Sequence, residues 1–174
     1  PPFMEPGLDK MLKIGLRKKL KISYEFKDVN SCDVVFISVG TPQLSDGSID
    51  LTNMKSVAKI LGKQYQKSTK KFQIIIKSTV IPGTTSEIIR ILERISKKKH
   101  GKDFDVITNP EFLRESRAIE DTINPHVIVM GAKNSNSLKK LSKFYKNMHP
   151  NASMIKTNHQ TAEMIKYANN AFLA

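Results

Sequence analysis

The sequence lacks several features that would assign it to a class of protein. Its 174 residues contain one cysteine, Cys32, so no disulfide can form within the chain and a cysteine-rich metal site is excluded. No stretch approaches the roughly 18 consecutive apolar residues that a membrane span needs, and the first residues show no basic-then-apolar signal pattern. We therefore expect a soluble, cytoplasmic protein without a membrane partner.

Acidic residues are few in comparison with basic ones. The chain has 16 Asp and Glu against 29 Lys and Arg, a formal net charge of +13, and such an excess can indicate nucleic-acid binding. However, nearly all of this charge is lysine spread over expected helix surfaces, and arginine, which base reading favours, occurs only at positions 17, 90, 94, 114 and 117. We interpret the charge as a solvated surface, with nucleic-acid or acidic-partner binding as the alternative.

The length suits one well-buried domain and is short for two. The first residue is Pro1 rather than methionine, and the last helical pattern, from Thr161 onward, reaches Ala174 without a terminating Gly, Asn or Pro. We expect the parent protein to extend in both directions.

Apolar residues alternate between strand-like and helix-like spacing along the chain. Strands are predicted at 20–26, 34–39, 72–76, 104–107, 127–130 and 154–156, and helices at 6–12, 50–61, 84–95, 138–148 and from 161. The continuous run 34–39 is typical of a central strand buried on both faces. This alternation predicts an α/β fold, a mostly parallel sheet covered by helices on both faces.

Polar side chains gather where two of these strands end, which is where open α/β sheets bind ligands. Glu111, Arg114 and Glu115 follow the strand 104–107. If Pro110 starts a short helix, Glu111 and Glu115 lie on one face, an arrangement that suits a general base next to a ligand or cation. A solvated, acid-rich helix start is the alternative.

Three further patterns have both a functional and a structural interpretation. Ser78 and Thr79 precede a helix with the capping-box spacing Thr84 to Glu87, so the segment could bind an anion or merely cap the helix. The residues 40–42 could bring backbone amides to the sheet edge or form a turn. Lys166 and Asn170 lie one helical turn apart on the last helix, where a plain polar face is the alternative.

Separated motifs occur here in a specific order: PFMEPGL at 2–8, VGTP at 39–42, DG at 46–47, DL at 50–51, STV at 78–80, PGT at 82–84, NPEFLRE at 109–115, AE at 162–163, KY at 166–167 and NNAFLA at 169–174. The chain thereby resembles the UDP-glucose/GDP-mannose dehydrogenase family, most closely its UDP-glucose 6-dehydrogenase branch. The resemblance covers nearly all of the residues present.

This resemblance implies an NAD-binding Rossmann-like domain over residues 1–157, missing its first β-α-β unit, and the start of a central helix over 158–174 that carries a homodimer contact. It also implies oxidation of the C6 alcohol of UDP-glucose to UDP-glucuronate, a precursor for polysaccharide biosynthesis, by two hydride transfers to NAD. In such enzymes a cysteine holds the aldehyde-level intermediate, then a thioester that water hydrolyses.

Site roles follow from the resemblance, position by position. The residues that would line NAD are Val39, Gly40, Thr41, Pro42, Gln43, Ser78, Thr79, Val80 and Glu115. Thr79 would also place a catalytic water, and Glu111 would be the base that activates it. The residues that would contact the sugar nucleotide are Glu111, Phe112, Leu113, Arg114, Glu115, Lys166 and Asn170. Lys166 and Asn170 would stabilise negative charge on the substrate oxygen. No metal is implied.

The sequence also departs from the family pattern. It contains no G-x-G-x-x-G fingerprint, Ser116 stands where the family has glycine, and His126 stands where a basic residue is common. The catalytic cysteine should lie beyond Ala174, and Cys32 cannot replace it. We expect these 174 residues alone not to turn over substrate.

Alternatives of three kinds remain. The parent enzyme could act on GDP-mannose or UDP-N-acetylmannosamine, it could be a nicotinamide enzyme for another hydroxy substrate, or the chain could be a non-catalytic basic binding module.

Overall fold

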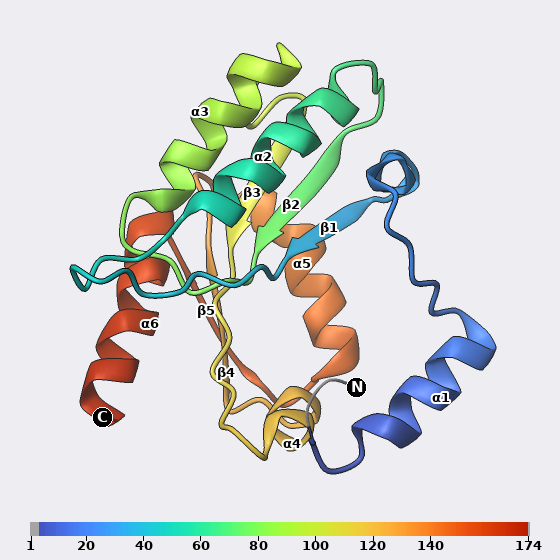
Figure 1. Cartoon of the computed structure of the whole chain (residues 1–174), viewed down its shortest axis with the longest axis vertical. Coiled ribbons are helices and arrows are strands. Elements are labelled where there is room, and N and C mark those ends of the chain that lie inside the picture. The colour runs from blue at the N-terminus through green and yellow to red at the C-terminus, as the bar shows by residue number, and fades with distance from the viewer. Residues whose placement is uncertain (1–3, 174) are drawn as a thin grey trace.

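The computed structural model describes residues 4–173 as a five-stranded sheet with helices on both faces (Figure 1). The strands are β1 Val34–Ile37, β2 Phe72–Ile76, β3 Phe104–Thr108, β4 Val127–Gly131 and β5 Ser153–Thr157. The helices are α1 Leu8–Lys18, the 3-10 helix η1 Phe26–Ser31, α2 Thr52–Tyr65, α3 Thr84–Ser96, α4 Ala118–Ile123, α5 Ser135–Met148 and α6 His159–Leu173. Three residues of the family motifs, Pro2, Phe3 and Ala174, lie outside the described residues.

The sheet has the strand order β1-β2-β3-β4-β5, and all neighbouring pairs are parallel except β3 and β4. Those two meet in one antiparallel pair, Thr108 opposite Gly131. The predicted α/β class and the Rossmann-like, mostly parallel sheet are confirmed. Because β1, β2 and β3 run in the same direction, the segments that follow them leave the sheet at one edge.

Two layers of apolar side chains hold the helices to the sheet. On one face, α2 and α3 pack on β1, β2 and β3 around fully buried residues such as Met54, Ile88 and Phe104 (Figure 1). On the other face, α5 covers Ile75 and Ile107 with its own Leu138, Leu141 and Tyr145. Within residues 4–173, no helix is both long enough and apolar enough to cross a bilayer.

Strand β1 differs from the predicted central strand. In the described part of the chain it pairs only with β2 and forms the edge of the sheet. Phe36 is therefore 41% exposed, and its ring lies 6.3 Å from the ring of Phe144 of α5. The apolar run did indicate a strand, but it could not show whether both sides of that strand are covered.

The strand predicted at 20–26 is wrong. Residues 20–25 are exposed and form no strand, and the chain then enters η1 at Phe26. Ile22 and Tyr24 are 65% and 98% exposed. An alternating pattern becomes a strand only where a neighbour can pair with it and bury its apolar side, and this segment runs as a separate connection between α1 and η1 (Figure 1).

The capping box predicted at Thr84 and Glu87 is also wrong. The Thr84 hydroxyl donates to the Ile81 carbonyl at 2.7 Å, and Glu87 pairs with Lys55 of α2 at 2.9 Å. The free N–H groups at the start of α3 instead bind a carboxylate from α6. Glu163, which is 1% exposed, accepts from Gly83 N at 2.6 Å and from Thr85 N at 2.8 Å.

Candidate active site

The segments that follow β1 and β2 are bound to one another at the carboxyl edge of the sheet. The Ser78 hydroxyl donates to the Val39 carbonyl at 2.7 Å, and the Thr41 hydroxyl donates to the Thr79 carbonyl at 2.8 Å. The side chains of Ser78 and Thr41 therefore bind backbone carbonyls. They join the segments 39–43 and 78–80, which we call the rim.

Gly40 leaves open space in this rim. A Cβ built on Gly40 would meet no atom within 4 Å, so a ligand can approach the backbone there. By contrast, Val80 is 2% exposed and its side chain belongs to the core, which leaves only its backbone for a ligand. Pro42 and Gln43 are exposed farther along the same segment.

The segment after β3 begins at a buried anchor. Asn109, 1% exposed, donates to the Val129 carbonyl at 2.7 Å, accepts from the Tyr145 hydroxyl at 2.5 Å, and gives its own N–H to Ile76 O at 2.8 Å. These bonds fix the end of β3 to β2, β4 and α5. The chain leaves the sheet at this point in a defined direction.

The short helix predicted from Pro110 is absent. Residues 109–117 contain no helix, and α4 starts only at Ala118. The Glu111 carboxylate accepts from the N–H of Leu113, two residues later, at 2.6 Å. Ser116 has a positive φ of 61°. Glu111 and Glu115 therefore do not share a helical face.

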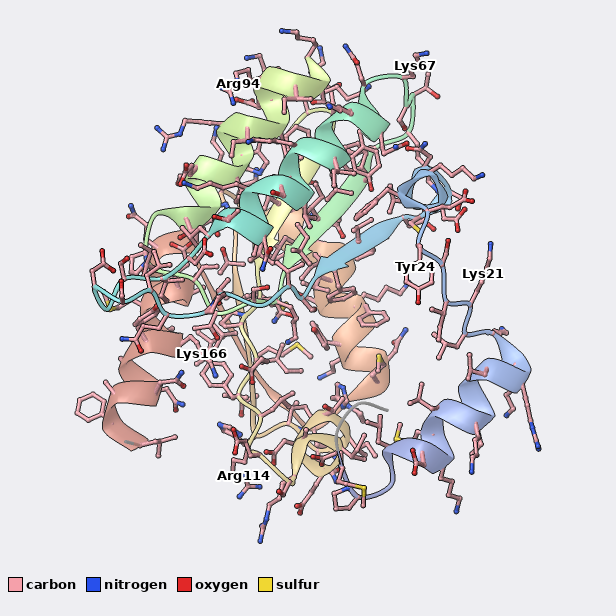
Figure 2. All side chains as sticks on the ribbon, viewed as in Figure 1. Lys21, Tyr24, Lys67, Arg94, Arg114 and Lys166 are labelled. Carbon is pink, nitrogen blue, oxygen red and sulfur yellow. The ribbon has the colours of Figure 1, made fainter. Side chains whose placement is uncertain are left out.

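Glu111 instead faces a cation from the last helix. The Lys166 amine lies 3.1 Å from Glu111 Oε1 and 5.3 Å from the centre of the Phe112 ring. Lys166 is 5% exposed, whereas the Glu111 side chain is 30% exposed. The cation is shielded from water, so the electrostatic interaction is stronger than that of a fully exposed ion pair. Figure 2 shows Lys166 reaching from α6 toward the strand ends.

Three other predicted site residues have different surroundings. The Arg114 guanidinium binds Asp121 of α4 through two nitrogens, at 3.1 and 2.7 Å, and its hydrogen bonds lower the pKa of Asp121 to about 2. Arg114 lies beside α4 in Figure 2, away from Lys166. Glu115 and Asn170 are exposed.

Lys77 is a site residue that the sequence reasoning did not single out. It follows β2 directly, and its amine donates to Asn109 Oδ1 and to the Pro110 carbonyl, both at 3.4 Å. Burial lowers the pKa of Lys77 to about 8, while the Glu111 carboxylate opposes the shift. The signal was available, because a lysine directly after a fully apolar strand end needs a polar partner.

A cavity of about 220 Å³ opens beneath the segment 109–113. Its walls come from that segment and from α4, β4 and α5, and they include Lys77, Glu111, Phe112, His126 and Tyr145. The structure thus brings Lys77, Glu111, Phe112 and Lys166 together at the carboxyl edge of the sheet. Thr79 lies in the neighbouring rim, bound to Thr41.

Comparison with known proteins identifies a family for this chain. The sequence profile of the UDP-glucose/GDP-mannose dehydrogenase family, NAD binding domain, matches residues 1–149. The chain belongs to this family. Its members are NAD-dependent nucleotide-sugar dehydrogenases, so the family predicted from the motif order is confirmed, as is NAD as its cofactor.

Named relatives include enzymes for different nucleotide sugars. The chain is 37% identical to the UDP-glucose 6-dehydrogenase of Haloferax volcanii, over 99% of this chain and 41% of the relative. It is 39% identical to the GDP-mannose 6-dehydrogenase of Pseudomonas putida, over 99% and 40%. The chain therefore spans about two fifths of the length of these relatives.

Solved structures give the same result. A ternary complex of GDP-mannose dehydrogenase from Pseudomonas aeruginosa matches with a TM-score of 0.93 at 37% identity, covering 98% of this chain and 39% of the other. The UDP-glucose dehydrogenase of Pyrobaculum islandicum matches with a TM-score of 0.91 at 35% identity, covering 99% and 40%.

The residues present fit part of an NAD site. The rim formed by 39–43 and 78–80 follows two parallel strands, β1 and β2. It offers free space at Gly40 and carries no acidic side chain that would repel a diphosphate. Open α/β sheets bind dinucleotides at such an edge.

Proposed function

We propose that this chain is part of an NAD-dependent dehydrogenase that oxidises the C6 alcohol of UDP-glucose to the carboxylate of UDP-glucuronate. The observation that carries the proposal is the contact of the buried Lys166 amine with the half-buried Glu111 carboxylate at the carboxyl edge of the sheet. Family membership indicates the reaction class. Within the pair, Lys166 is a cation that suits negative charge on a substrate oxygen, and Glu111 is a carboxylate that can accept a proton.

Each group of the pair has a task that its chemistry suits. The Lys166 amine, nearly free of contact with water, can donate to a substrate oxygen as negative charge develops there. The Glu111 carboxylate can accept a proton from a water that attacks a thioester. NAD, when bound, accepts the hydride. The residues that would hold its nicotinamide end are Ser78, Thr79 and the backbone of Val80, and the residues 39–43 would line the rest.

The nucleotide sugar would lie over the segment 109–115. The ring of Phe112 and the side chain of Leu113 stand beside Glu111, and they offer apolar contact to a base or sugar face. Arg114 would have to exchange Asp121 for the substrate, or contact it from the bound position. We assign UDP-glucose on the motif at 109–115, and GDP-mannose is the main competitor because relatives of both kinds match.

The test is steady-state NADH formation by the full-length gene product with UDP-glucose, GDP-mannose and UDP-N-acetylmannosamine. We expect two NADH per UDP-glucose oxidised. Glu111→Gln should lower kcat by about 10²- to 10⁴-fold, the range for a general base, while Glu120→Gln on the exposed side of α4 leaves it unchanged. One NADH per sugar, or an unimpaired Glu111→Gln enzyme, contradicts the mechanism.

We further propose that α6 forms part of a homodimer contact. Met164 and Phe172 of this helix are 53% and 90% exposed, which is costly for large apolar side chains in water. Light scattering of the full-length gene product should give the mass of a dimer, and Phe172→Asp should shift it toward the monomer. An unchanged mass for Phe172→Asp excludes this part of α6 from the contact.

A further inference from the structure

Lys77 occupies a position that neither packing nor hydration explains. It is largely buried at the end of β2 and lies against the cavity beneath 109–113. Within residues 4–173 its amine donates to two neutral acceptors, Asn109 Oδ1 and Pro110 O, both at the long distance of 3.4 Å. Placing an amine there with such partners is costly, so we look for a role in the two hydrogen bonds that it donates.

Both acceptors of Lys77 belong to the turn that leads to Glu111. The side chain of Asn109 is hydrogen-bonded to Val129 and Tyr145, which fix its position. Pro110 is the next residue, and its carbonyl is the last backbone acceptor before Glu111. Because the Lys77 amine donates to both residues, it helps to fix the direction in which the chain leaves the sheet.

The charges around Glu111 favour the same position of the turn. Lys166 lies on one side of this carboxylate at 3.1 Å, and Lys77 approaches it from the cavity, where both side chains form the wall. Two amines thus attract one carboxylate from two elements, α6 and the end of β2. Loss of either amine should let the carboxylate turn toward the other or toward solvent.

We propose that Lys77 is a positioning residue that holds the Asn109–Pro110–Glu111 turn from inside the cavity, so that Glu111 stays against Lys166. This inference rests on the proposed function for its effect on catalysis, but not for its effect on the turn. It assigns a role to a lysine to which the proposed function gives none.

The charge of Lys77 also predicts a dependence on pH. Its pKa of about 8 means that the amine loses its proton as the pH rises from 7 to 9. The other titratable groups around the cavity are Glu111, Asp121, His126, Tyr145 and His149, with Lys166 behind Glu111. Arg114 keeps the pKa of Asp121 near 2, and burial raises that of Tyr145 to about 12, so neither titrates in this interval.

The experiment is backbone hydrogen exchange of the full-length gene product, read in peptides that cover residues 109–117. Lys77→Met should raise exchange there about fivefold, the value of one lost hydrogen bond, and Lys77→Arg, which stays charged, should raise it less. Lys59→Met, on the exposed side of α2, is the matched control and should change nothing. Exchange in Lys77→Met equal to that of the wild type overturns the proposal.

Two further readouts separate the role of Lys77 from the proposed function. Opening of the turn exposes the Lys77 amine, and its pKa then returns from about 8 toward the ordinary value of a lysine. The open state therefore binds more protons above pH 8, and protection of 109–117 should rise between pH 7 and 9 after correction for intrinsic rates. This measurement decides the matter even if Lys77→Met does not fold. Protection that stays constant or falls overturns the proposal. In the enzyme, Lys77→Met should lower kcat about 10- to 100-fold with little change in KM. A wild-type enzyme that forms no NADH refutes the proposed function. The exchange data still test whether Lys77 positions the turn.

Discussion

Replacement of Glu163 by glutamine should destabilise the protein markedly, although this residue is distant from the sheet edge in sequence and was not predicted to matter. Glu163→Gln keeps one oxygen for either Gly83 N–H or Thr85 N–H, but places an NH₂ group against the other donor. One charge-assisted hydrogen bond, worth about 1.5–3 kcal/mol, is lost. The favourable interaction of the carboxylate with the N-terminus of α3, about 0.5–1 kcal/mol, is lost with it.

These contributions add up to about 2–4 kcal/mol of the free energy of unfolding, and relief from burying a carboxylate reduces the sum. For a domain of this size we expect the melting temperature to fall by roughly 5–12 °C. Urea unfolding followed by circular dichroism measures the loss directly, because the chain has no tryptophan for fluorescence. Glu120→Gln, an exposed glutamate of α4, is the control.

A loss below about 0.5 kcal/mol, within the range of ordinary surface substitutions, would refute the reasoning. It would mean that the start of α3 finds other acceptors when the carboxylate is removed. Glu163 also lies one helical turn before Lys166 on α6. The same variant should therefore disturb the Lys166–Glu111 pair and lower kcat in the full-length gene product.

Three other changes test separate parts of the structure. Gly131→Ala should cost about 1–3 kcal/mol in urea unfolding, because its Cβ would lie 2.5 Å from the Asn158 carbonyl, whereas Gly40→Ala meets no atom and should cost far less. Ser116→Gly should stabilise by about 0.5–1 kcal/mol by relieving a positive φ, and Ser116→Ala should not. Burial lowers the pKa of His159 to about 4, so the unfolded chain binds more protons than the folded one below pH 6.5. The free energy of unfolding should therefore fall by up to about 3 kcal/mol toward pH 4. His159→Phe should flatten this dependence in urea midpoints measured from pH 7 to 4.5.

The layered fold could be predicted because its signals are local. Apolar runs such as 72–76 and 104–107 fill both sides of a strand, and helical spacing from Thr84 to Ile95 marks a helix whatever it packs on. The failed strand at 20–26 had the same local signal. What it lacked was a partner strand, and pairing is a property of the whole sheet that alternation alone does not report.

The site could be predicted only in part, for the same reason. The motif at 109–115 indicated a polar segment at the end of β3 but not its conformation, because the i, i+4 argument assumed a helix that residues 109–117 do not form. The capping box failed because Glu163, some 80 residues later, supplies the acceptor instead. Lys166, a residue that looks like part of a polar helix face, is buried only because α6 lies against the strand ends.

Helix α6 determines how the two halves of the site meet. Through Glu163 it holds the start of α3 and thereby the end of the segment that begins at Ser78. Through Lys166 it holds Glu111 in the segment that follows β3. The rim proposed for NAD and the carboxylate proposed as base are therefore positioned by one rigid element, and a shift of α6 changes both contacts together. A dimer contact on the exposed side of α6 would bear directly on this helix, so a substitution there should alter kcat as well as oligomeric mass.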